Sequence, residues 1–195
     1  MLIFWKQRLV FLATPKAGST AVEVALESLA SVSIQRPAAL KHTDIAAYRR
    51  HVGPWLLDQT GEAFTTVALM REPVDWLQSW YRFRLRDDHE DAQHLMEGVS
   101  FARFAQQYGQ PDGPQTLGIE SQTNFLKHDG NQVERIFRYE AIDDFIRFLE
   151  DRLDCAIELP RINVPPPVDV SLTADAEHRL RAAMADDISL YRTLV

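Results

Sequence analysis

The sequence predicts an α/β fold, a three-layer arrangement in which a parallel β-sheet carries helices on both faces. The continuous apolar runs Leu9–Ala13 and Phe64–Met70 are typical of strands buried on both faces. Strand and helix patterns alternate along the chain, which favours parallel pairing. No linker, repeat or low-complexity tract divides the 195 residues, so residues 1–195 are predicted to form a single domain.

Composition excludes several classes of protein. The formal net charge of −7 argues against general nucleic-acid binding, which needs a basic surface. No run approaches the roughly 20 apolar residues of a membrane span, and the apolar N-terminus is interpreted as a first strand rather than a signal peptide. Cys155 is the single cysteine, so no internal disulfide can form and a reducing, cytoplasmic location is expected.

The strand Leu9–Ala13 is followed by the tight turn Thr14–Gly18 and then by a helical pattern through Leu29. A turn between a strand and a helix aims backbone N–H groups at an anion. The side chains and backbone available there are those of Lys16, Ala17, Gly18, Ser19 and Thr20. They supply positive charge, hydroxyl donors and a close approach at the glycine, so a phosphate site is predicted.

This turn differs from the ATP-type phosphate loop, in which a lysine directly follows a glycine. Here Lys16 precedes Gly18 by two residues, and no glycine lies further upstream. The alternative interpretation is a plain strand–helix turn with a capping Ser or Thr.

His42 follows a weak second strand pattern over Ser31–Gln35 and precedes a helix that Thr43 or Asp44 can cap. In open α/β sheets, ligands bind at the carboxyl ends of the strands. His42 is therefore a candidate site residue, although a histidine in a polar loop can equally be a surface residue.

The strand Phe64–Met70 ends in Arg71-Glu72-Pro73, and Pro73 suits the first turn of a helix. Arg71 at the strand end and Ser79 two turns into the helix can face one ligand near the sheet edge. The alternatives are an ion pair with Glu72 or a helix-start contact for Arg71, and a packing role for Ser79.

Later segments predict a helix at Glu120–Leu126 that presents Gln122, a strand at Val133–Phe137 and a core helix at Ile142–Leu153. Thr173 is predicted to cap a last helix that runs to about Leu194. His89 and His94 match no metal-ligand spacing, so no metal site is predicted.

Together these motifs resemble those of the sulfotransferases that use 3′-phosphoadenosine 5′-phosphosulfate (PAPS), most closely the carbohydrate-type branch and its bacterial relatives. Thr14–Thr20 resembles the family's 5′-phosphosulfate loop, and Leu69–Tyr81 resembles its 3′-phosphate motif. His42 matches the place of a catalytic base. Further matches in order are Gln122, Arg138-Tyr139-Glu140 and Pro160-Arg161-Ile162-Asn163. Arg161 and prolines stand where the family has a glycine-containing basic loop.

The resemblance implies a P-loop-NTPase-like sulfotransferase fold and in-line transfer of a sulfuryl group from PAPS to a hydroxyl acceptor, without a metal. It implies that Lys16 stabilises the leaving phosphate, that His42 is the general base, and that Ser79 restrains Lys16. Asp44 and Glu62 remain alternative bases. The nucleotide-binding residues that it implies are Lys16, Ala17, Gly18, Ser19, Thr20, Arg71, Ser79, Gln122 and Arg161.

Two rival functions remain, a nucleotide kinase or other NTPase of related fold and a non-catalytic nucleotide-binding module. The sequence does not identify the acceptor, so a glycan, a phenol or a small metabolite all fit. It is also silent on oligomeric state.

Overall fold

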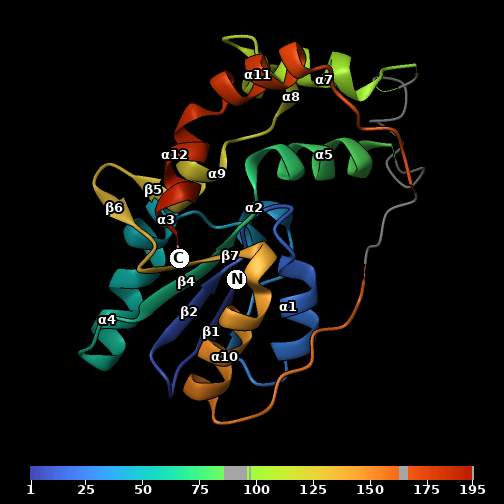
Figure 1. Ribbon diagram of the computed structural model, residues 1–195. Coiled ribbons are helices and arrows are strands. Elements are labelled where there is room, and N and C mark those ends of the chain that lie inside the picture. Colours follow the sequence, from blue (N-terminus) through green and yellow to red (C-terminus); the bar gives the residue numbers. More distant parts are fainter. Residues whose placement is uncertain (86–95, 97, 163–166, 195) are drawn as a thin grey trace.

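The computed structural model describes residues 1–85, 96, 98–162 and 167–194 (Figure 1). It is a mixed α/β fold built on a five-stranded sheet with the strand order β3-β1-β2-β4-β7. The strands of this sheet are β1 (Leu2–Phe4), β2 (Leu9–Leu12), β3 (Val32–Ser33), β4 (Thr65–Met70) and β7 (Arg135–Arg138). A separate hairpin pairs β5 (Lys127–His128) with β6 (Asn131–Gln132).

The prediction of a wholly parallel sheet is wrong at one side. Strands β2, β4 and β7 are parallel, but β1 runs antiparallel to both β2 and β3. The four residues 5–8 join β1 to β2. So short a connection can only make a hairpin, because a parallel pair needs a crossover of a dozen or more residues.

Helices cover both faces of the sheet, as predicted. Alternate strand residues such as Leu9, Phe11 and Leu69 pack against α1 (Ser19–Leu26) and α10 (Ile142–Leu153). The opposite residues, such as Val10 and Leu12, pack on the other face against further helices. Those helices are α3 (Ile45–Ala47), the π-helix η1 (Tyr48–Val52), α4 (Gly53–Thr60) and α9 (Gln122–Leu126).

A third core cluster lies beyond the edge at which the parallel strands end (Figure 1). There α5 (Pro73–Arg84) packs against α7 (Phe101–Tyr108) and α11 (Ala174–Ala183) through Trp76, Phe104 and Leu180. The other described helices are α2 (Ala38–Lys41), α8 (Gly113–Leu117), the 3₁₀ turn η2 (Tyr139–Ala141) and α12 (Ala185–Thr193). This cluster places α5 directly above the strand ends.

Several local predictions are confirmed. The helix over Ile142–Leu153 buries Phe145 and Leu149. The side chain of Thr173 caps α11 by accepting from the Ala176 amide. The last helix is not continuous, however, because it breaks at Met184, where a buried side chain joins the third cluster and α12 begins.

Among the described residues, no helix combines the length and the apolar character needed to cross a membrane.

Candidate anion-binding and catalytic site

The carboxyl ends of the three parallel strands meet at one edge of the sheet. The turn Thr14–Gly18, which we call the lysine turn, follows β2, while Arg71 follows β4 and Tyr139 follows β7. These strands are neighbours in parallel register, so the three segments that leave them lie together. The topology therefore brings the lysine turn and Arg71 to one place, as the sequence predicts.

The lysine turn leads into α1 with unpaired backbone amides from Ala17 onward. Lys16 and Gly18 both have positive φ, at 61° and 77°. Within the described part of the chain, the amides of Ala17 through Thr20 donate to no acceptor, and the buried Thr14 hydroxyl also lacks a partner. Consecutive unpaired amides at a helix N-terminus form a cradle for an anion. This donor set fits a phosphate or sulfate group.

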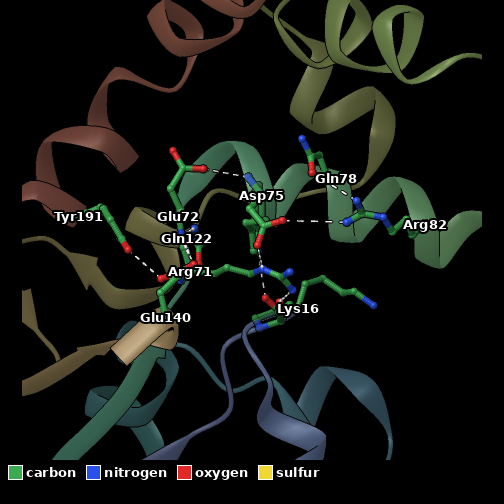
Figure 2. Close-up of polar contacts among 11 residues, drawn as sticks. Lys16, Arg71, Glu72, Asp75, Gln78, Arg82, Gln122, Glu140 and Tyr191 are labelled. Atoms are coloured by element: carbon green, nitrogen blue, oxygen red, sulfur yellow. Dashed lines mark hydrogen bonds and ion pairs between the residues drawn. The ribbon is translucent and has the colours of Figure 1, made fainter. Parts of the chain in front are cut away.

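Helix α5 packs directly over the lysine turn. The Trp76 indole N–H donates to the Pro15 carbonyl at 3.0 Å, and the Lys16 ammonium lies 3.7 Å from the centre of the Phe83 ring. Residues three, four and seven positions apart share a helix face. Ser79 therefore lies on the same side of α5 as Trp76 and Phe83, facing the turn, and Figure 2 shows the Lys16 side chain extending beneath α5.

The Arg71 guanidinium joins the lysine turn to α5. It donates to the Lys16 carbonyl at 3.3 Å and to the Asp75 carboxylate at 2.6 Å (Figure 2). Its ion pair is with Asp75, one helical turn away, and not with Glu72. Asp75 also lies 4.0 Å from Arg82, so one carboxylate faces two guanidinium groups.

Tyr139 fills the space between Arg71 and Gly18. The Arg71 guanidinium stacks 4.9 Å from the centre of the Tyr139 ring. A Cβ at Gly18 would lie only 2.6 Å from the same ring, so the glycine is required by packing as well as by its positive φ.

Gln122 holds the backbone of Arg71. Its side-chain oxygen accepts from the Arg71 amide at 2.9 Å, and its side-chain nitrogen donates to the Arg71 carbonyl at 2.8 Å. Gln122 is 1% exposed, so its side chain lies behind Arg71 and is not accessible to a ligand in this conformation. The side-chain amide of Gln122 thus extends the hydrogen bonding of β4 one residue beyond Met70. This indicates that Gln122 positions Arg71.

His42 ends α2 beside the end of β2. Its Nδ1 lies 2.6 Å from the Ala13 carbonyl oxygen. Burial lowers the pKa of His42, although the contact with Ala13 opposes this effect. A neutral ring that donates from Nδ1 keeps its lone pair on Nε2, so His42 has the form that a general base needs.

The buried carboxylate of Glu23 holds α2, the helix that ends at His42, against α1. Glu23 on α1 is 2% exposed and forms an ion pair with Lys41 at 2.7 Å. The pair ties α2 to α1, and Lys41 directly precedes His42.

The remaining residues that the sequence singles out are not assigned to the site. The Arg161 side chain is exposed. Asn163, His89 and His94 lie outside the described residues. In the part of the chain that is described, no three His, Cys, Asp or Glu side chains are grouped as a metal site.

A cavity of about 240 Å³ lies beside the Arg71 turn, between α5 and α11. Three carboxylates line it, those of Glu72, Asp75 and Glu177, against the single arginine Arg181. This excess of negative charge disfavours a phosphate, and the lining includes neither Lys16 nor His42.

Sequence reasoning missed Asp75, although its spacing of four residues from Arg71 is a recognised helical ion-pair signal. It also missed Asp187, whose contacts with α9 cross 64 and 65 residues of chain and leave no local signal.

Comparisons of the chain with protein-family models, with curated proteins and with solved structures find no match, so the sulfotransferase resemblance rests on the sequence motifs alone.

Proposed function

We propose that this chain is a PAPS-dependent sulfotransferase of the P-loop-like sulfotransferase fold, acting on a hydroxyl acceptor. The observation that supports the proposal most is the contact between the lysine turn and Arg71, from the Arg71 guanidinium to the Lys16 carbonyl. It gives one sheet edge two adjacent anion-binding groups. A nucleotide with phosphate at both ends needs such a pair.

Two groups of residues would bind the two charged ends of the nucleotide. The amides of Ala17 to Thr20 and the Lys16 ammonium would hold the 5′-phosphosulfate. Arg71 and Ser79 would hold the 3′-phosphate. Each charge-assisted hydrogen bond contributes about 1.5–3 kcal/mol net, so several together support affinity of about micromolar strength after ordering costs.

As in phosphoryl transfer, the protein mainly positions the reacting groups and stabilises the charge that develops in the transition state. PAPS supplies an activated sulfuryl group, whose bond to the phosphate oxygen breaks as a bond to the acceptor oxygen forms. The Lys16 ammonium stabilises charge on the departing phosphate oxygen. Nε2 of His42 takes the proton from the acceptor hydroxyl, a contribution of roughly 10²–10⁴ in rate.

Calorimetric titration with adenosine 3′,5′-bisphosphate tests the proposal. We expect saturable binding with a dissociation constant on the order of micromolar, and weaker binding of AMP, which lacks the 3′-phosphate. The Arg71→Ala variant should lose affinity for the bisphosphate and keep that for AMP. Absence of bisphosphate binding by the natural chain would refute the proposal.

The rival functions give different results in the same assays. A kinase or NTPase would bind ATP in a magnesium-dependent manner and would not prefer the bisphosphate. A binding module would bind the bisphosphate and transfer no sulfate to any hydroxyl acceptor. Screening glycans, phenols and small alcohols with labelled PAPS separates these cases and identifies the acceptor class.

Asp75 competes with a phosphate for Arg71, because its carboxylate already occupies the guanidinium at 2.6 Å. We expect Asp75→Asn to tighten bisphosphate binding about two- to fivefold, the scale of a partly exposed ion pair. The gain should shrink at high salt. Asp144→Asn, which removes an exposed ion pair with Arg147 on α10, is the matched control. Weaker binding by Asp75→Asn would mean that Asp75 orients Arg71 instead.

A further inference from the structure

Helix α12 is connected to the Arg71 turn through α9. The Asp187 carboxylate on α12 is 1% exposed and accepts from the backbone amides of Gln122 and Thr123, at 3.3 and 2.8 Å. These two amides belong to the first turn of α9, where no intrahelical acceptor exists for them. The side chain of Gln122 in turn accepts a hydrogen bond from the amide of Arg71 and donates one to its carbonyl.

A second connection runs through η2. The Tyr191 hydroxyl on α12 donates to Glu140 at 2.7 Å, and the other oxygen of Glu140 accepts from the Glu72 amide at 2.8 Å (Figure 2). The Arg138 guanidinium lies 4.8 Å from the centre of the Tyr191 ring and donates to the Tyr191 carbonyl. Tyr191 is therefore held in place from both its ring and its backbone.

The two connections converge on consecutive residues. The amides of Arg71 and Glu72 and the carbonyl of Arg71 are all paired with side chains from other elements. The position of this backbone determines where the Arg71 side chain points. Small displacements of a phosphate-binding group lose affinity, because charge-assisted hydrogen bonds depend on distance and angle.

We propose that Asp187 and Tyr191 are positioning residues: through α9 and η2, helix α12 sets the Arg71 turn for the 3′-phosphate of the nucleotide, and 3′-phosphate binding is coupled to the docking of α12. The inference rests on the proposed function. It assigns neither residue a contact with the ligand, and it predicts that their loss affects one end of the nucleotide only.

The test measures the affinity of the full chain and its Asp187→Asn and Tyr191→Phe variants for adenosine 3′,5′-bisphosphate and for AMP. We expect roughly tenfold weaker binding of the bisphosphate by each variant, within the usual range of coupling between sites. AMP affinity should change less than about twofold, because AMP makes no 3′-phosphate contact. Asp186→Asn, an exposed neighbour with the same change of charge, should behave as the natural chain.

A second readout uses reciprocity, since a coupling between two sites acts in both directions. The bisphosphate should slow hydrogen exchange of the α12 amides, and AMP should not. Tyr191→Phe removes one hydroxyl and keeps the ring, so it remains a valid test if Asp187→Asn fails to fold.

The outcomes separate the two proposals. If the natural chain binds no bisphosphate, the proposed function fails and this inference falls with it. If the natural chain binds, but both variants bind the bisphosphate normally or lose both ligands equally, the inference alone is overturned.

Discussion

Replacing His42 with alanine is expected to lower turnover about 10²–10⁴-fold while leaving the affinity for adenosine 3′,5′-bisphosphate unchanged. The contact between Nδ1 and the Ala13 carbonyl fixes the ring and directs the lone pair to Nε2. Alanine removes the proposed proton acceptor and none of the groups assigned to the phosphates. Single-turnover rates with labelled PAPS, together with calorimetry, measure the two quantities separately.

His51→Ala is the control, because His51 is exposed on η1 and has no role in the site. If turnover survives in His42→Ala, another group takes the proton. Asp44 is then the better candidate, although its carboxylate already caps α3 through the Ala47 amide at 2.6 Å. Glu62 pairs with Arg8 before the start of β4, at the opposite edge of the sheet, so geometry disfavours it.

The pH profile gives an independent check on His42. Its pKa is lowered by burial from the usual 6.5, so the ring is neutral at pH 7 and turnover should fall only as the pH drops below 6.5. The pKa of His42 is lower in the folded state than in the unfolded state, so the unfolded chain binds this proton more readily. Protonation of His42 therefore lowers the free energy of unfolding as the pH falls below 6.5. His42→Ala should lose both the acid limb of activity and this part of the acid destabilisation.

Gly18→Ala is expected to lower the free energy of unfolding by about 2–5 kcal/mol. A left-handed conformation costs an alanine about 1–2 kcal/mol, and overpacking adds about 1–3 kcal/mol. The added Cβ meets the Tyr139 ring at 2.6 Å, and that ring supports the Arg71 guanidinium. Bisphosphate affinity should therefore fall along with stability, as urea unfolding and calorimetry can measure.

Gly61→Ala isolates the contribution of packing. Gly61 has nearly the same φ, 72° against 77°, but no atom lies within 4 Å of its Cβ position. We expect a loss of only about 1–2 kcal/mol there, from backbone conformation alone. Adding Tyr139→Ala to Gly18→Ala should recover part of the larger loss. Equal effects at the two glycines would show that the Tyr139 contact does not matter.

The sequence by itself predicts the features that depend on neighbours in the chain. The apolar run Phe64–Met70 becomes the buried strand β4, and the stripe that includes Phe145 and Leu149 becomes the buried face of α10. Thr173 caps α11 because its side chain needs an amide only three residues away. The lysine turn and Arg71 each follow a predicted parallel strand, so the sequence also predicts that they lie at the same edge of the sheet.

Only the tertiary structure decides which distant groups complete these features. The pairing of β1 with β3, the use of Gln122 to hold Arg71 and the contact of Asp187 with α9 all depend on segments far apart in the chain. Periodicity and capping are local signals, whereas a buried amide or carboxylate selects its partner from whatever the folded chain brings within about 3 Å. Local pattern therefore predicts the anion-binding turn, and long-range packing determines the groups that orient Arg71 and His42.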